Sequence, residues 1–110
     1  DHPNQRFLPP SGGEGVIRWA KNPSKCLDVT GGSTSNRNAV QLFDCAMGAK
    51  HPNQQFAIPT GYQGPIRWLA HPKCFDVKAG SAANGNAVQL FDCAERADHP
   101  NQQFIVPQPG

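Results

Sequence analysis

Apolar and polar residues alternate over short runs along this chain. In the run Lys-Cys-Leu-Asp-Val, Leu27 and Val29 fall on one face of an extended strand and Asp28 on the other, because successive side chains of a strand point to opposite faces. Gly, Ser, Asn and Pro fill the gaps between such runs, as turns require. No useful window shows a helical period. The pattern therefore predicts an all-β chain of short strands.

The same runs return after 48 residues. Residue i and residue i+48 are identical at 24 of 35 positions over residues 25–59, and a period in the forties indicates a repeat architecture. Each unit has four strand candidates. They are residues 17–19, 25–29, 39–45 and 55–58 in the first unit and 66–68, 73–77, 87–93 and 103–106 in the second.

The chain opens on what resembles the end of a unit. His-Pro-Asn-Gln-Arg-Phe at 2–7 nearly copies a hexapeptide that occurs twice later, His-Pro-Asn-Gln-Gln-Phe. We therefore expect residues 1–10 to form the final strand of a preceding repeat. Repeat A then spans residues 11–59 and repeat B spans residues 60–110. The nine strand candidates are not a multiple of four, so we expect the chain to be cut within a repeat.

Strand parity separates an apolar face from a polar and aromatic one. The expected core face of repeat A carries Leu27, Val29, Val40 and Leu42. The opposite face carries Cys26, Asp28, Gln41, Phe43 and Cys45 in repeat A and Cys74, Asp76, Gln89, Phe91 and Cys93 in repeat B. A carboxylate accepts bonds from adjacent hydroxyls, an amide donates and accepts, and an aromatic ring stacks on the apolar face of a pyranose. The Asp–Gln–Phe sets predict a sugar site on an exposed face of each repeat.

Several neighbouring residues have less specific interpretations. Asn53 and Asn101 lead into the fourth strands, where an amide can reach the same pocket. Asp44 and Asp92 are expected to be turn or cap residues. A lone surface Asp or Gln is usually only solvated, and a Phe in a strand is usually part of the core. Duplication also copies structural residues, so recurrence favours a shared site without proving one.

The four cysteines favour one disulfide in each repeat. Cys26 and Cys45 share a face of neighbouring predicted strands, as do Cys74 and Cys93. Four cysteines allow three connectivities, and the equal spacing favours Cys26–Cys45 and Cys74–Cys93. A zinc site made by all four thiolates is the alternative, but the close paired spacings of known zinc sites are absent from the sequence. So many cysteines in a small chain point to an oxidising compartment and a secreted protein.

Composition narrows the function classes. The chain has 110 residues, enough for one small domain, with 11 Gly and 11 Pro that favour turns over long helices. Its net charge is +2 and its ten Lys and Arg are scattered, so no nucleic-acid partner is predicted. No apolar run in the sequence is long enough to span a bilayer. Glycoside hydrolysis needs two facing carboxylates, whereas the repeated Asp28 and Asp44 lie on opposite parity. We predict no enzyme, catalytic residue or cofactor.

The order of these motifs resembles the ricin B-chain-type lectin repeat, the β-trefoil family with a Gln-x-Trp signature. The resemblance rests on Cys-x-Asp, then Gln-x-aromatic-x-Cys, then Asn-Gln-x-aromatic, which occur in this order twice. Phe56 and Phe104 replace the signature Trp, and Phe43 and Phe91 stand where Trp is frequent. The resemblance implies ricin B-type β-trefoil repeats, here as two complete four-strand units plus a leading fourth strand, with the trefoil incomplete within the chain.

The resemblance also implies roles for the candidate residues. Asp28 and Asp76 would grip sugar hydroxyls, Gln41 and Gln89 would support them, and Phe43 and Phe91 would be stacking platforms. Asn53 and Asn101 would complete each pocket, with Gln54 and Gln102 beside them. Binding in the family needs no metal, and galactose or N-acetylgalactosamine-type sugars are the first expectation. Within-repeat disulfides in the family agree with the parity argument.

Two functions therefore compete. The first is a secreted, multivalent carbohydrate-binding protein with shallow sites. The second is a structural extracellular fibre or matrix component assembled from lectin-like repeats. Three arrangements would complete the trefoil: a longer array of repeats, strands supplied by another copy, or head-to-tail stacking into a filament.

Overall fold

The computed structural model describes residues 7–46, 51–78, 88–94 and 100–106, and its regular elements are short strands and three-residue 3-10 helices. The strands are β1 (Phe7–Leu8), β2 (Glu14–Gly15), β3 (Arg18–Trp19), β4 (Asn22–Val29), β5 (Val40–Asp44), β6 (Phe56–Ala57), β7 (Gln63–Gly64), β8 (Arg67–Trp68), β9 (Lys73–Val77), β10 (Val88–Asp92) and β11 (Phe104–Ile105). The 3-10 helices are η2 (Ser11–Gly13), η3 (Thr30–Gly32), η4 (Pro52–Gln54), η5 (Thr60–Tyr62) and η7 (Pro100–Gln102). In these described parts, no helix is long and apolar enough to cross a membrane.

All nine predicted strands are present, each within one to three residues of its expected bounds where the structure describes it. Residues 1–6 and 87 belong to predicted strands but lie outside the described residues. The sequence missed β2 and β7, two-residue strands that each follow a glycine turn. Each consists of one polar residue and one glycine, Glu14–Gly15 and Gln63–Gly64, so neither offers an apolar position that the pattern could reveal.

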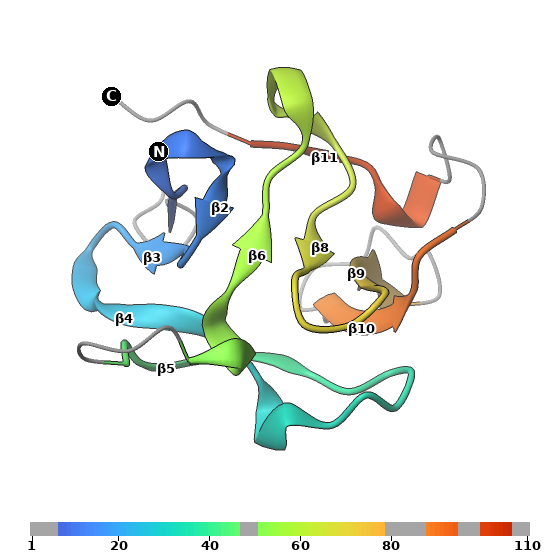
Figure 1. The fold of residues 1–110 in the computed structure, drawn as a ribbon, viewed down its shortest axis with the longest axis horizontal. Coiled ribbons are helices and arrows are strands. Elements are labelled where there is room, and N and C mark those ends of the chain that lie inside the picture. Colours follow the sequence, from blue (N-terminus) through green and yellow to red (C-terminus); the bar gives the residue numbers. More distant parts are fainter. Residues whose placement is uncertain (1–6, 47–50, 79–87, 95–99, 107–110) are drawn as a thin grey trace.

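The strands form three antiparallel sheets, and one of these sheets joins the two repeats. Their orders are β1-β3-β4-β5, β10-β9-β8-β6-β2 and β11-β7. Because β2 of repeat A pairs with β6, and β6 pairs with β8 of repeat B, the second sheet crosses the repeat boundary. Figure 1 shows β6 running through the middle of the molecule, with β4 and β5 to one side and β9 and β10 to the other.

The β4–β5 and β9–β10 hairpins have the same register. Asp28 lies opposite Gln41 and Cys26 opposite Phe43, while Asp76 lies opposite Gln89 and Cys74 opposite Phe91. The registers differ by 48 residues throughout, so the sequence repeat is also a repeat of strand pairing. A shared register places equivalent side chains on equivalent faces.

The core is a cluster of apolar side chains from both repeats. Its buried members are Ile17, Val29, Phe56, Ile66, Trp68, Phe75 and Leu90. The ring of Phe56 meets that of Phe75 edge-on at 5.0 Å between centroids. The indole Nε1 of Trp68 donates to the carbonyl of Pro52 at 2.7 Å, so its one polar atom is satisfied inside the fold.

One predicted core residue is not in the core. Leu42 is 42% exposed, whereas Leu90 at the matching position of repeat B is 0% exposed, so the prediction for Leu42 was wrong. The strands differ in their surroundings: β5 is the edge of its sheet, while a segment of repeat A lies against the edge of β10. There Leu90 N donates to the Asn38 carbonyl and Arg37 N donates to the Leu90 carbonyl, both at 2.7 Å. A bridge between Ala39 and Gln89 extends this contact.

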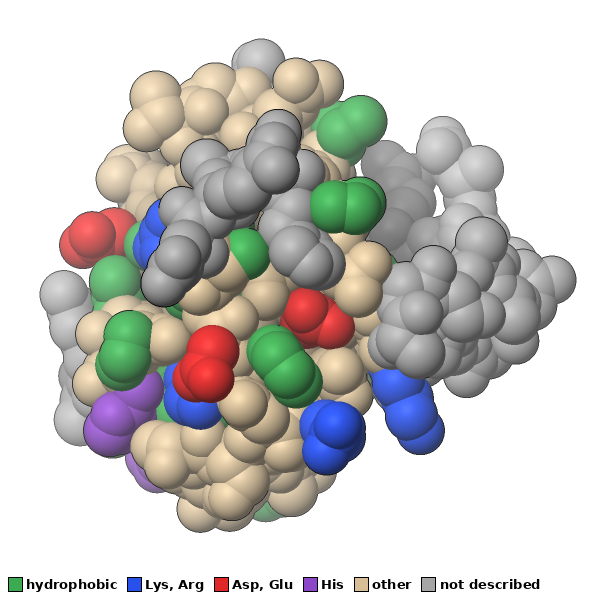
Figure 2. All heavy atoms as spheres, turned by 90° about the vertical axis from the view of Figure 1, so that its right-hand side faces the viewer, with side chains coloured by type: hydrophobic (Ala, Val, Ile, Leu, Met, Phe, Trp, Pro, Cys, Tyr) green, Lys and Arg blue, Asp and Glu red, His purple; other side chains and the backbone are tan. Residues whose placement is uncertain are grey.

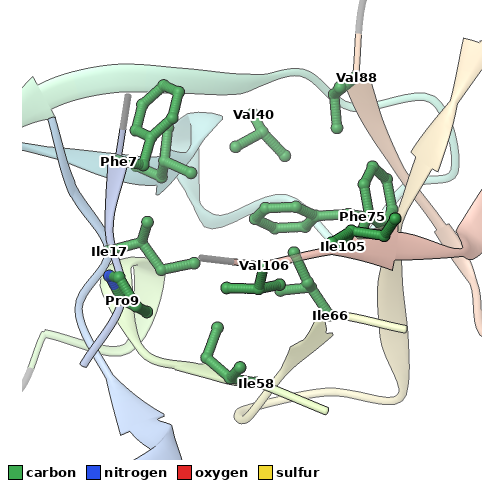
Figure 3. Close-up of a pocket in the computed structure, with 12 residues that line it drawn as sticks. Phe7, Pro9, Ile17, Val40, Ile58, Ile66, Phe75, Val88, Ile105 and Val106 are labelled. Atoms are coloured by element: carbon green, nitrogen blue, oxygen red, sulfur yellow. The ribbon is translucent and has the colours of Figure 1, made fainter. Parts of the chain in front are cut away.

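An apolar cavity of about 300 Å³ opens beside the core. Figure 3 shows apolar side chains from both repeats and from the segment around β1 pointing into it. They include Phe7, Ile17, Ile66, Val88 and Ile105. Ile105 is 82% exposed even though it lines this cavity.

Candidate site in each repeat

Asp28, Gln41 and Gln54 of repeat A are joined by hydrogen bonds. Together with Phe43 and Asn53 they are the candidate residues that we call site A. The corresponding group of repeat B, site B, is Asp76, Gln89, Phe91, Asn101 and Gln102. The hairpin register places the Asp and Gln side by side on neighbouring strands, and the 3-10 turn before the fourth strand supplies the Asn and second Gln.

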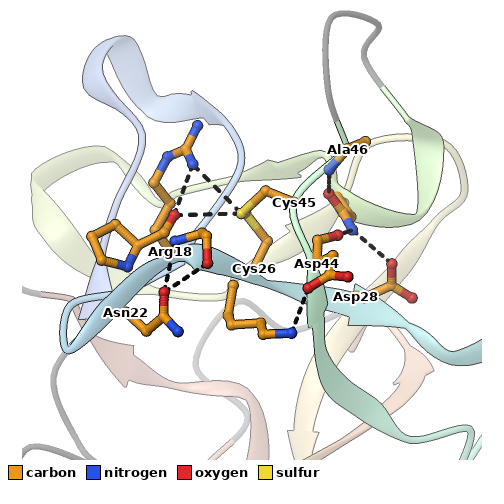
Figure 4. Close-up of a disulfide and its surroundings, with 11 residues drawn as sticks. Arg18, Asn22, Cys26, Asp28, Asp44, Cys45 and Ala46 are labelled. Carbon is orange, nitrogen blue, oxygen red and sulfur yellow. Dashed lines mark hydrogen bonds and ion pairs between the residues drawn. A yellow bond between two sulfur atoms is a disulfide. The ribbon is translucent and has the colours of Figure 1, made fainter.

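The carboxylate of site A is held by two amides. Gln41 Nε2 donates to Asp28 Oδ1 at 3.3 Å and Gln54 Nε2 donates to Asp28 Oδ2 at 2.9 Å. Gln54 also donates to the Asp44 carbonyl and accepts from Ala46 N, both at 2.8 Å; Figure 4 shows these bonds around Asp28 and Ala46. Both amide hydrogens of Gln54 are thus bonded within the protein, so Gln54 positions Asp28 from beneath.

Site B repeats this arrangement. Gln89 Nε2 lies 3.3 Å from Asp76 Oδ1, and Gln102 Nε2 lies 3.1 Å from Asp76 Oδ2. Gln102 also donates to the Asp92 carbonyl at 2.9 Å and accepts from Ala94 N at 2.8 Å. The two networks match bond for bond.

The carboxylates lie deeper than a fully exposed face would place them. Asp28 is 6% exposed and Asp76 is 5% exposed. Each carboxylate oxygen has more than one acceptor position, so the bond from a glutamine does not exhaust its capacity. Asp76 lines a cavity of about 530 Å³ together with Gln89, Phe91, Asn101 and Gln102. The fold therefore brings all five predicted residues of site B to one hollow.

The two aromatic side chains differ in exposure. Phe43 is 56% exposed, so its ring is open to solvent. Phe91 is half-buried and forms part of the cavity wall. Both follow the Gln of their strand by two residues, which puts ring and amide on the same face.

Asn53 is placed by a close turn. A Cβ built on Gly32 would lie 2.9 Å from Asn53 Oδ1, so the glycine lets the two turns approach. Asn53 N donates to His51 Nδ1 at 3.2 Å. His51 therefore caps the η4 turn, in keeping with its place before proline.

The disulfides pair as the sequence predicted. Cys26 is bonded to Cys45 and Cys74 to Cys93, each across a separation of 19 residues. Figure 4 shows the first bond beside Arg18, whose guanidinium donates to the Pro23 carbonyl at 2.9 Å. These bonds use all four thiols, so the zinc alternative was wrong. The described residues contain no cluster of His, Cys, Asp and Glu suited to a metal ion.

Asp44 and Asp92 end their strands, but they form cross-strand ion pairs rather than caps. Asp44 pairs with Lys25 across the hairpin, and Asp92 Oδ1 lies 2.6 Å from Lys73 Nζ. The hydrogen bond from Lys73, followed by that from Asn36, holds the pKa of Asp92 below its usual range. The prediction that these aspartates lie at the ends of their strands was correct, but it did not include the ion pairs. The strand register, which places Lys73 opposite Asp92, was needed to recognise them.

Sequence reasoning missed two residues of the site B cavity, Arg37 and Lys78. Lys78 directly follows β9 and was readable as a charged neighbour of Asp76. Arg37 comes from repeat A, between η3 and β5, and reaches site B only because its segment lies against β10. No sequence signal marks such a contact.

Comparison with known proteins places this geometry in context. A family model described as a ricin-type beta-trefoil lectin domain matches residues 13–110. A solved structure titled as that of a designed 3-fold symmetric protein, ThreeFoil, superposes with a TM-score of 0.73 at 24% identity, covering 94% of this chain and 71% of that one. No curated protein matches the chain.

Proposed function

Because the chain belongs to the ricin-type β-trefoil lectin family, we propose that it is a secreted carbohydrate-binding protein that recognises glycans through site A and site B. The observation that carries this proposal is the hollow of site B, where a carboxylate, two amides, an asparagine and an aromatic ring line one cavity. These groups recognise the two kinds of surface that a pyranose presents, its hydroxyls and its apolar face.

The hydrogen bonds within each site support a different role for each residue. Asp28 and Asp76 accept hydrogen bonds from neighbouring hydroxyls, while Gln54 and Gln102 hold the carboxylates in place. A carboxylate fixed in this way loses little conformational freedom when a sugar binds. Phe43 and Phe91 stack on the ring, and Asn53 and Asn101 add a side-chain amide. No metal or cofactor takes part.

Multivalency is the source of useful affinity. A small, open site that recognises one sugar binds weakly, and two such sites on one rigid chain gain avidity on a surface that displays many sugars. Galactose and N-acetylgalactosamine are the first ligands to test. The two disulfides suit an oxidising, extracellular setting.

Titration calorimetry with galactose and N-acetylgalactosamine tests the proposal, using the single variants Asp28→Asn and Asp76→Asn and the double variant. Asparagine keeps the side-chain size and removes the charge, so folding is monitored by circular dichroism. Each single variant should lose one site and the double variant should lose both. Unchanged binding by a folded double variant would overturn the proposed sites. The exposed Glu14→Gln serves as the control for loss of one carboxylate.

A structural role in an extracellular assembly is the second candidate function, and the apolar cavity favours it. The chain covers 71% of a three-fold symmetric protein, roughly the share of two units in three. This proposal also takes residues 1–10 as the final strand of a preceding repeat, residues 11–59 as repeat A and residues 60–110 as repeat B. A second copy of the chain would then cover the cavity with a unit of like chemistry and build an oligomer or filament.

Sedimentation and native mass under non-reducing conditions test this second candidate. Ile105→Asp places a charge at the cavity, and Leu69→Asp places one at another exposed apolar residue that does not line it. Self-assembly predicts a concentration-dependent oligomer that Ile105→Asp disperses and Leu69→Asp preserves. A monomer at every concentration, or a native chain longer than 110 residues whose further repeat covers the cavity, would contradict it.

A further inference from the structure

Two basic residues line the site B cavity together with the candidate sugar-binding residues. Arg37 and Lys78 line the same hollow of about 530 Å³ as Asp76, Gln89 and Asn101. Figure 2 shows the side of the molecule to which β9 and β10 belong, with basic, acidic and hydrophobic side chains close together.

Arg37 is fixed to repeat B by its own backbone and by its neighbours. Its N–H donates to the Leu90 carbonyl at 2.7 Å, and the Asn38 carbonyl accepts from Leu90 N at 2.7 Å. On the other side, Asn36 donates to Asp92 Oδ2 at 3.1 Å and accepts from Asp92 N at 2.9 Å. These hydrogen bonds hold the backbone of Arg37 against β10 in the way that strand pairing holds a residue within a sheet.

The backbone of Arg37 is held in a conformation that favours glycine. Its φ is +75°, where side chains other than glycine are uncommon, and the aligned residue of repeat B is Gly85. Arginine at such a position costs about 1 kcal/mol or more of strain. Strained residues cluster at functional sites, so this strain on the cavity wall supports a functional role for Arg37.

Charged residues of both signs line this cavity. Asp92 is paired with Lys73 at 2.6 Å, and Asp76, Arg37 and Lys78 line the same hollow. Within the described residues, the guanidinium of Arg37 has no hydrogen-bonding or ion-pairing partner. Repeat A has Thr30 where repeat B has Lys78, so the second basic residue is particular to site B.

We infer that site B selects acidic sugars, a carboxylated or sulfated saccharide, while site A takes neutral ones. A guanidinium binds a carboxylate or sulfate through two parallel N–H···O bonds, and a lysine beside it adds a point charge. Asp76 and Phe91 hold the ring, and Arg37 reads the anionic substituent. This inference rests on the proposed carbohydrate-binding function and names the ligand class for one of its sites.

Matched sugars that differ only at carbon 6 provide the test. Galactose and galacturonic acid, and glucose and glucuronic acid, are titrated against the full chain by calorimetry at low and at high salt. Arg37→Gly installs the aligned residue of repeat B, Lys78→Thr that of repeat A, and Lys21→Ala removes an equal charge from an exposed position elsewhere.

The acid of at least one pair should bind site B about tenfold or more tightly than its neutral partner at low salt, since a hydrogen bond between charged groups has this magnitude. High salt should shrink the preference. Arg37→Gly should remove most of it, Lys78→Thr part of it, and Lys21→Ala none. A preference that survives Arg37→Gly would overturn the inference.

The outcomes separate this inference from the proposed function. Equal binding of acid and neutral sugar, lost on Asp76→Asn, would overturn the acidic selectivity and leave the carbohydrate site intact. Acid binding that is lost on Arg37→Gly but unchanged on Asp76→Asn would mark a simple anion site and overturn the sugar reading. Absence of binding to every sugar tested would overturn both.

Discussion

Gln54 holds Asp28 from beneath, with its amide nitrogen 2.9 Å from one carboxylate oxygen, and Gln102 stands in the same relation to Asp76 at 3.1 Å. Both glutamines are almost fully buried, and each uses its side-chain amide to orient a carboxylate. Each buried glutamine makes three hydrogen bonds: to the Asp carboxylate, to a backbone carbonyl and from a backbone N–H. The stability of the fold and the geometry of the candidate site therefore depend on the same bonds.

Gln54→Ala should therefore lower the free energy of unfolding by roughly 2–4 kcal/mol, because it leaves Asp28, Ala46 N and the Asp44 carbonyl with unmet hydrogen bonds in a buried place. Urea unfolding measures the change. Gln63→Ala is the control, since Gln63 is exposed on β7. A loss no greater than that of the control would show that water replaces the amide, and that Gln54 does not stabilise the site.

Strand parity was sufficient to predict which strand side chains of each site share a face. Asp28 and Gln41 came to one face because their strands pair in the register that the alternation required. The same reasoning placed Leu42 in the core and was wrong, because burial there depends on what lies against the sheet edge. The place of Arg37 could not be predicted from strand parity either. Arg37 reaches site B through a contact between the two repeats, and no periodic pattern in the sequence marks that contact.

Two adjacent glycines separate backbone strain from ligand geometry. Gly31 and Gly32 have φ of +61° and +66°, but only a Cβ at Gly32 would meet Asn53, at 2.9 Å. Each alanine substitution should cost about 1 kcal/mol of strain. Repeat B carries Ala79 at the position aligned with Gly31.

Gly32→Ala should in addition weaken sugar binding at site A several-fold, because the new methyl group displaces the Asn53 amide, while Gly31→Ala leaves binding unchanged. Calorimetry in an Asp76→Asn background reads site A alone, and urea unfolding checks that the two variants are equally stable. Equal affinities for the two variants would exclude Asn53 from the binding site.

Asp92 should make the fold sensitive to acid. Its hydrogen bonds from Lys73 and then Asn36 lower its pKa below the ordinary value of 3.8. A carboxyl whose pKa is lower in the folded state stabilises the fold above the unfolded pKa, and this contribution is lost as the pH falls through the folded pKa. Urea midpoints measured from neutral pH down to about pH 2 should fall less steeply for Asp92→Asn than for the unaltered chain. Glu14→Gln is the control, and parallel curves for all three proteins would contradict the prediction.

The two disulfides should stabilise the fold equally. Each closes a loop with a separation of 19 residues, and a loop of that size corresponds to about 3 kcal/mol of lost entropy in the unfolded chain. Cys26→Ala/Cys45→Ala and Cys74→Ala/Cys93→Ala should therefore shift the urea midpoint by similar amounts. Alanine is the right replacement because Cys26 and Cys74 are 0% exposed, and serine would bury a hydroxyl without an assured partner. Clearly unequal losses would mean that packing around the sulfur atoms, which differs between the repeats, outweighs loop closure.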